Sequence, residues 1–72
     1  MKLGRYKHFQ GNEYMVLAIA KHSETLEDFV VYEALYDNKV SKVWVRPVSM
    51  FTDKVEKDGK MVDRYEYIGD KE

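Results

Sequence analysis

The chain has 72 residues, with twelve basic and thirteen acidic side chains, a formal net charge of -1 and no cysteine. A chain this short cannot support two cores, so a single domain over residues 1–72 is expected. The lack of cysteine excludes disulfides and thiolate metal sites and favours a reducing, cytoplasmic environment. No apolar run is long enough to cross a bilayer and no signal-peptide pattern follows Met1, so a soluble protein with no membrane partner is expected.

The first predicted strand covers residues 4–9, where Tyr6 and His8 alternate with residues of a wetter face. A two-residue period of this kind is typical of a half-buried strand. Residues 10–13 contain Gly and Asn, which accept positive φ in tight turns. A hairpin to the next strand is therefore expected.

Two further strands are predicted on either side of a polar loop. Residues 14–21 are apolar at nearly every position, which fits either a buried strand or a core helix, but the preceding turn and the short length favour a strand. Residues 29–36 are rich in Val, Tyr and Phe and are predicted as a central strand. Residues 23–28 gather carboxylates with Ser and Thr, which favour a loop.

Residues 42–46 are predicted as a short strand with two distinct faces. The two-residue period places Trp44 and Arg46 on one face and Val43 and Val45 on the other. We expect the two valines to take the core, which would leave Trp44 and Arg46 at least partly accessible to solvent.

Pro47 ends this strand because it cannot donate a hydrogen bond to a ladder. Residues 48–51 are long enough for one helical or 3₁₀ turn, with Met50 and Phe51 expected to plug the end of a barrel.

Asp58 and Gly59 form the dipeptide that best suits a two-residue type I′ hairpin, because both central positions need positive φ. The flanking residues 54–57 and 60–68 are predicted as the two strands of that hairpin. Residues 69–72 are expected to fray.

Five or six short strands, joined by tight turns and interrupted by one helical turn, predict an all-β fold. The specific architecture expected is a small, closed, SH3-like antiparallel barrel.

Three motifs stand out along the chain. They are His22-Ser23-Glu24-Thr25, Val31-Tyr32 with Leu35-Tyr36, and Trp44-Val45-Arg46-Pro47 followed by Met50-Phe51. With these motifs the chain closely resembles, over nearly its whole length, a family of small bacterial proteins known as domain of unknown function 1653. The resemblance implies an SH3-like barrel and brings no established activity, since this barrel hosts many unrelated binding functions.

His22, Ser23 and Glu24 contain the residue types of a catalytic triad, but consecutive residues cannot arrange its hydrogen-bonded chain. The alternative is a capped turn, in which Ser23 or Thr25 accepts backbone N–H groups and His22 bonds Glu24. No catalytic residue is predicted, and we expect the protein not to be an enzyme.

His8 and His22 are the only histidines, and no ligand-spacing motif brings carboxylates to either of them. The glycines are scattered singly, so no Gly-rich phosphate loop is present. We therefore expect neither a metal nor a cofactor.

Trp44 and Arg46 are the better candidates for a binding site, because an aromatic ring beside a guanidinium is a common anchor pair at interaction surfaces. The alternative is that Trp44 packs in the barrel and Arg46 pairs with an acidic neighbour. The complete candidate binding set adds the polar loop, on the assumption that a closed barrel brings loop and strand together. The set is His22, Ser23, Glu24, Thr25, Trp44 and Arg46.

The expected function is a monomeric module that binds a protein or peptide. The alternative is an accessory protein that binds single-stranded RNA, suggested by Lys2, Arg5 and Lys7 together with the aromatic content. The net charge of -1 argues against non-specific nucleic-acid binding. An enzyme that uses residues 22–25 is the third hypothesis.

Overall fold

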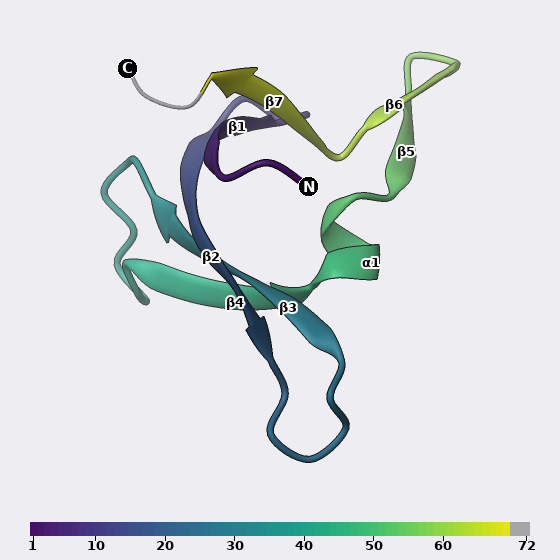
Figure 1. Ribbon diagram of the computed structural model, residues 1–72. Helices are drawn as coiled ribbons and strands as arrows, with labels where there is room; N and C mark the ends of the chain where they lie inside the picture. Colours follow the sequence, from purple (N-terminus) through teal and green to yellow (C-terminus); the bar gives the residue numbers. More distant parts are fainter. Residues whose placement is uncertain (70–72) are drawn as a thin grey trace.

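The computed structural model describes residues 1–69, so the predicted fraying of residues 70–72 lies outside the described residues. Seven strands and one helical turn follow each other along the chain (Figure 1). They are β1 (Gly4–His8), β2 (Glu13–Lys21), β3 (Asp28–Ala34), β4 (Val43–Pro47), α1 (Val48–Phe51), β5 (Lys54–Lys57), β6 (Lys60–Asp63) and β7 (Tyr65–Gly69). No helix within residues 1–69 has the length and apolar character needed to span a membrane.

The strands form two antiparallel sheets, which confirms the predicted all-β class. Five strands form a curved sheet in the order β4-β3-β2-β1-β7, and β5 and β6 form a separate hairpin (Figure 1). Within residues 1–69 the two sheets are not joined by a continuous ladder, so the hydrogen bonds do not close the barrel. The SH3-like assignment stays a prediction.

The segment 60–68, predicted as one strand, is two strands that separate at Arg64. The Arg64 N–H donates to the carbonyl of Asp53, and the Arg64 carbonyl accepts from the N–H of Phe9. These bonds lie at the point where the chain passes from the β5–β6 hairpin to the main sheet. A single continuous strand could not pair with β5 in one sheet and with β1 in the other, so the chain breaks between them.

The core lies on the inner, concave face of the main sheet. Cross-strand register places Val16 opposite Tyr32, and Tyr32 opposite Trp44, so these side chains share one face. Phe51, from α1, is only 1% exposed, and its ring stacks on that of Tyr65 with centroids 4.0 Å apart. The buried apolar residues are Tyr6, Val16, Val30, Tyr32, Ala34, Phe51 and Tyr65.

The predicted orientation of β4 is wrong. Trp44 and Arg46 share a face and are partly exposed, as expected, but the face is the inner one, and Trp44 packs against the core. Val43 and Val45 point outward and are 49% and 61% exposed. The larger apolar surface of the indole gains more from burial than a valine does, which explains why the indole takes the inner side.

The prediction that Met50 plugs the barrel beside Phe51 is also wrong for Met50, which is 52% exposed. Successive residues of a helical turn point about 100° apart, so only one of two neighbours can face the core. Phe51 takes that position because its larger ring fills the space over Tyr6 and Tyr32.

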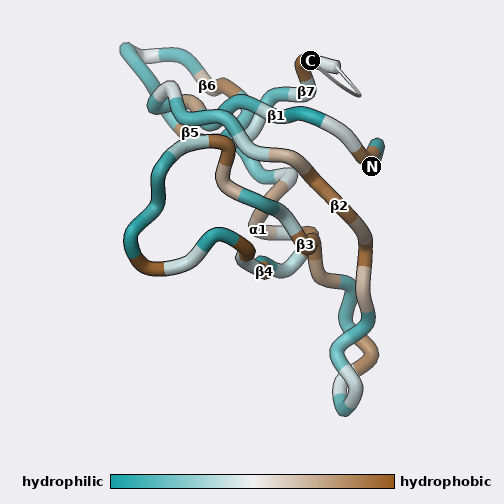
Figure 2. The backbone as a smooth tube through the Cα atoms, turned by 90° about the vertical axis from the view of Figure 1, so that its left-hand side faces the viewer, coloured by the Kyte–Doolittle hydropathy of each residue, from teal (hydrophilic) through white to brown (hydrophobic). Residues whose placement is uncertain are grey.

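The β2–β3 hairpin reaches away from the body of the molecule (Figure 1). The apolar run is a strand, as predicted, but it is buried only near its start, and Leu17 and Ile19 are 43% and 40% exposed. The strand passes from its buried part to its exposed part at a shift of register between Val16 and Ala18. Figure 2 shows the apolar residues of β2 continuing toward the projecting tip.

The Asp58-Gly59 turn is confirmed. Asp58 and Gly59 have φ of 54° and 79°, and Lys57 pairs with Lys60 across the turn. Positive φ at both central positions is the signature of the type I′ hairpin.

Candidate functional site

A cavity of about 310 Å³ opens on the inner face of the sheet, beside the aromatic core. All five strands of the main sheet and two loops supply its lining. The lining residues are His8, Gln10, Asn12, Tyr14, Tyr32, Tyr36, Asn38, Trp44, Arg46 and Tyr65, and we call this cavity the aromatic pocket.

Buried tyrosines form the floor of the aromatic pocket. Tyr32 and Tyr65 are 5% and 7% exposed, with ring centroids 5.9 Å apart. Tyr14 contacts both rings edge-on, at centroid distances of 5.4 Å and 5.7 Å. Edge-to-face geometry of this kind is the favoured arrangement of aromatic rings, so the floor is rigid.

A chain of hydrogen bonds fixes one rim of the pocket. The hydroxyls of Tyr14 and Tyr36 share a hydrogen bond of 2.9 Å, and Asn38 Nδ2 donates to the Tyr36 hydroxyl at 3.0 Å. Asn38 Oδ1 in turn accepts the N–H of Val40 at 3.0 Å. Burial, and then the bond to Tyr36, raise the pKa of Tyr14, so its hydroxyl stays protonated at neutral pH.

Trp44 forms part of the wall and is held by its own loop. Its indole Nε1–H donates to the carbonyl of Ser41 at 3.0 Å. The ring is half-buried and packs against the core, so the indole is fixed in orientation while one part lines the pocket.

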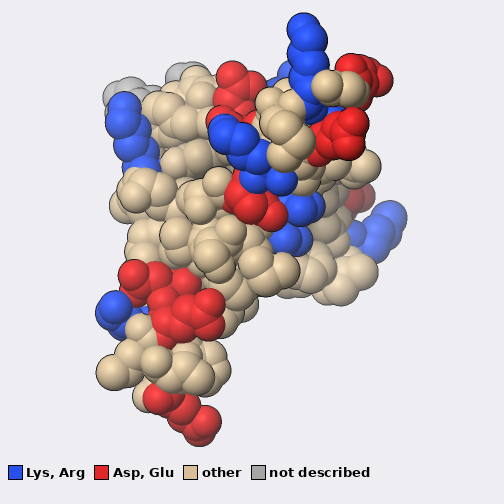
Figure 3. All heavy atoms as spheres, turned by 90° about the vertical axis from the view of Figure 1, so that its right-hand side faces the viewer, with Lys and Arg blue, Asp and Glu red and all other residues tan. Residues whose placement is uncertain are grey.

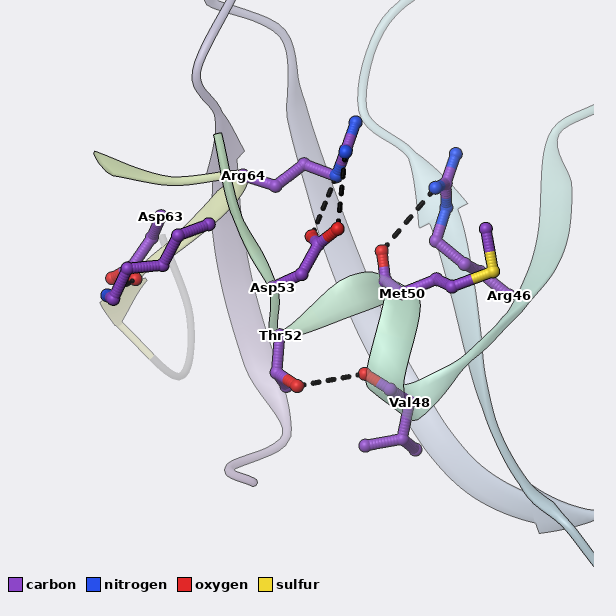
Figure 4. A network of polar contacts seen from close by, with 8 residues as sticks. Arg46, Val48, Met50, Thr52, Asp53, Asp63 and Arg64 are labelled. Carbon is purple, nitrogen blue, oxygen red and sulfur yellow. Dashed lines mark hydrogen bonds and ion pairs between the residues drawn. The ribbon is translucent and has the colours of Figure 1, made fainter. Parts of the chain in front are cut away.

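Arg46 brings a guanidinium to the pocket. Its guanidinium carbon lies 5.8 Å from the centre of the Tyr65 ring, and Nη1 donates a long bond of 3.5 Å to the carbonyl of Met50 (Figure 4). The Tyr32 hydroxyl is the main cause that raises the pKa of Arg46. Arg46 takes part in none of the ion pairs formed within residues 1–69. The alternative prediction, that Arg46 pairs with an acidic neighbour, is therefore wrong for the described residues.

Asp53 and Arg64 form a bidentate pair near this site (Figure 4). Arg64 Nε lies 2.8 Å from Asp53 Oδ1, and Nη2 lies 3.2 Å from Oδ2. The Arg64 guanidinium holds the pKa of Asp53 below its usual value. Both carboxylate oxygens of Asp53 are therefore already bound, although its charge also reaches Arg46.

His8 lines the pocket from the end of β1. Its ring is 4.9 Å from that of Tyr65, and its Nδ1 accepts the backbone N–H of Gln10 at 3.1 Å. Burial first, and then the positive charges of Arg64 and Arg46, lower the pKa of His8. His8 is therefore neutral at pH 7, with its proton on Nε2.

The predicted loop residues lie elsewhere. His22, Ser23, Glu24 and Thr25 are all exposed at the tip of the β2–β3 hairpin, and none of them lines the aromatic pocket. The structure therefore does not bring this loop together with Trp44 and Arg46. Figure 3 shows acidic side chains gathered on the projecting hairpin.

The loop has the geometry of a capped turn. His22 Nδ1 accepts the backbone N–H groups of Glu24 at 3.2 Å and Thr25 at 3.3 Å. Thr25 Oγ1 accepts the N–H of Glu27 at 3.2 Å. Thr25 is one of the two acceptors expected for this turn, and His22 bonds Glu24 as expected, through the backbone N–H of Glu24.

The sequence prediction missed most of the pocket. The two-residue period places His8 on the same face as the buried Tyr6, so this signal could have indicated His8. Trp44 pairs across the strands with Tyr32, so a search for its partner among the tyrosines could have indicated Tyr32. Asn12 and Asn38 come from turns, where no periodicity indicates which way a side chain points.

A second, larger hollow of about 460 Å³ lies between β1, β7 and the β5–β6 hairpin. Lys54 and Lys57 line it, but Lys54 binds Asp63 and Lys57 donates to the carbonyl of Phe9. Both ammonium groups are therefore engaged within the chain. Within residues 1–69, no cluster of three or more His, Asp or Glu side chains could hold a metal ion.

Residues 4–67 match the model of a family described as protein of unknown function (DUF1653), and the chain belongs to this family. A crystal structure of a family member from Bordetella bronchiseptica is similar, with a TM-score of 0.91 and 29% sequence identity. The match covers 96% of this chain and 88% of the Bordetella chain. No functionally curated protein matches the chain.

Proposed function

We propose that this protein is a non-catalytic, cytoplasmic module that binds a protein or peptide, and that the aromatic pocket is its binding site. One observation carries the proposal: a guanidinium and several ordered aromatic rings line one concave site. Arg, Trp and Tyr are the residues most enriched among those that dominate binding energies at protein interfaces.

The floor of the pocket is preorganised, which supports binding. The Tyr14 and Tyr65 rings are held by edge contacts, and Trp44 by its hydrogen bond to Ser41. A rigid site loses little conformational entropy when a ligand enters. Its pocket volume is at the lower end of ligand sites, and suits one or two residues of a peptide.

The chemistry of the lining favours binding over catalysis. His8 is a possible base, but the described lining places no Ser, Thr, Cys or carboxylate beside it. The hydroxyls of Tyr14 and Tyr65 are held protonated, because burial raises the pKa of both side chains. They are suited to donating hydrogen bonds rather than to attacking a substrate.

A peptide array probed with the labelled protein tests this function. We expect a set of related sequences to bind, and Arg46→Gln to weaken that binding. His22→Ala is the matched control in the other candidate segment, and should bind like the wild type. Loss of binding in His22→Ala with retention in Arg46→Gln would move the site to the loop, and an array without hits would contradict the function.

Single-stranded RNA is the second candidate, supported by the larger hollow, where Lys7, Lys54 and Lys57 lie near Phe9. A basic groove with an aromatic ring is the usual pattern for single strands. Asp63 and Glu66 line the same hollow and offset its charge. Titration with oligouridylate at low and at high salt decides, because binding through phosphates must weaken steeply as salt rises.

A further inference from the structure

We propose that the aromatic pocket recognises a peptide carboxylate next to an apolar or aromatic side chain, with the Arg46 guanidinium binding the carboxylate. This inference rests on the proposed function and adds the chemistry of the ligand to it.

The charge of the pocket lining points to an anionic group. The lining includes one permanent cation, Arg46, and no Asp or Glu among the described residues. His8 adds no positive charge at neutral pH, because burial lowers its pKa. A ligand with one negative charge would therefore be balanced inside the pocket, whereas a cationic ligand would meet an uncompensated like charge.

The donors of Arg46 are available for such a ligand. A guanidinium has five N–H donors in a planar fork that matches a carboxylate. One bond goes to the carbonyl of Met50, at the long distance of 3.5 Å, and the Tyr32 hydroxyl, the main cause of the raised pKa of Arg46, engages at most one more of the five donors. The nearby carboxylate of Asp53 is bound through both oxygens by Arg64, so it does not compete for the fork.

The remaining lining fits the rest of a peptide. Trp44 and Tyr36 offer aromatic surface for an apolar side chain. The carboxamides of Gln10, Asn12 and Asn38 carry both donors and acceptors, which match the N–H and C=O groups of a peptide backbone. The pocket thus combines an anion-binding group, an apolar surface and backbone partners.

A carboxylate fits better than a phosphate. Proteins that track phosphates use several basic groups, whereas this pocket presents a single guanidinium. The carboxylate has two sources in a peptide, the C-terminus and an Asp or Glu side chain, and the experiment below separates them.

Trp44 is the only tryptophan, so its indole N–H signal in a proton–nitrogen NMR spectrum reports on the pocket alone. The probes are acetyl-alanyl-alanyl-phenylalanine with a free C-terminus, the same peptide as its amide, and acetyl-alanyl-glutamyl-phenylalanine amide. Phenyl phosphate is the phosphate probe. We expect the free acid to bind with a dissociation constant of about 1 mM or lower, and the plain amide to bind about ten- to a hundredfold more weakly.

Three variants test the role of Arg46. In Arg46→Gln the advantage of the free acid over the amide should vanish, and in Arg46→Lys it should be smaller than in the wild type, because an ammonium lacks the planar fork. Lys39→Gln makes the same change in net charge at an exposed position, and should retain the advantage. The full NMR spectrum of each variant verifies that it is folded.

The outcomes separate this inference from the proposed function. Equal binding of acid and amide would overturn the carboxylate and leave the peptide-binding function standing. Binding of the glutamyl amide alone would assign the carboxylate to a side chain. Tighter binding of phenyl phosphate than of every peptide would overturn the inference in favour of a phosphate. The inference would also be overturned if no peptide shifted the Trp44 signal. In that case the peptide array would test the proposed function by itself.

Discussion

The guanidinium carbon of Arg46 lies 5.8 Å from the centre of the Tyr65 ring, so a charged side chain of β4 meets an aromatic ring of β7. These strands are the two edges of the five-stranded sheet. Their side chains meet because the sheet curves around its core (Figure 1). The pocket therefore exists only in the folded sheet, and it depends on the packing that holds β7 in place.

Phe51 is the centre of that packing, since its ring stacks on Tyr65 and contacts Tyr6 and Tyr32 edge-on. Phe51→Ala should lower the free energy of unfolding by about 3–5 kcal/mol, because a large buried ring is lost and a cavity remains. Met50→Ala is the adjacent control, and should change stability by no more than about 0.5 kcal/mol. Urea melts measure both, and equal effects would contradict this account of α1.

Gly59 has φ of 79°, and outside Gly59 and its two chain neighbours no heavy atom lies within 4 Å of the position that a Cβ would take. Gly59→Val should therefore destabilise the protein through backbone strain and not through a clash, by about 1–3 kcal/mol. Gly59→Asn should cost less, because Asn adopts positive φ more readily. A thermal melt in which both variants match the wild type would count against the turn.

The Asp53–Arg64 pair should make the stability of the protein depend on pH in the acidic range. Arg64 lowers the pKa of Asp53 in the folded protein below the ordinary value of 3.8. The unfolded state then binds the proton first, so the stabilisation is complete above that value and is lost as the pH falls through the lowered pKa.

Asp53→Asn should accordingly lower Tm at pH 7, and the difference from the wild type should shrink below about pH 4. Asp37→Asn, at a side chain 89% exposed, is the control and should leave Tm unchanged. A Tm difference for Asp53→Asn that stays constant from neutral to acid pH would rule out the ion pair as its cause.

His8 should titrate below the ordinary value of 6.5, because burial and the charges of Arg64 and Arg46 disfavour its protonated form. Its contribution to stability is complete above 6.5 and is lost as the pH falls toward the lowered pKa of the folded state. NMR titration of the imidazole measures this pKa. Arg46→Gln should raise the pKa of His8, because it removes one of the nearby positive charges. An unchanged His8 pKa in this variant would contradict the geometry of the pocket.

The elements of the fold were largely predictable, because they depend on local signals. Pro47 ends β4 as its missing N–H requires, and Asp58-Gly59 makes the expected turn. The break at Arg64 was not predictable, since it arises from hydrogen bonds to Asp53 and Phe9 that are distant in sequence.

The candidate site was predicted only in part, for a related reason. Periodicity showed that Trp44 and Arg46 share a face, but which face is inner depends on the partner strand and on the competition between Trp44 and the valines for burial. Residues 22–25 were predicted as part of the site from their residue types alone. Tyr65 lies in the pocket because the sheet curves, which no residue type indicates. Neither register nor curvature is encoded in a short motif.

The central claim is that the aromatic pocket is the binding site, and chemical-shift mapping with a peptide from the array tests it most directly. The account predicts that the largest shifts fall on the indole N–H of Trp44 and the backbone of residues 8–14, 36–38 and 44–46, with contacts from the peptide to the ring of Tyr36. Shifts concentrated on residues 22–25 or 54–63, with the Trp44 signal unmoved, would contradict it.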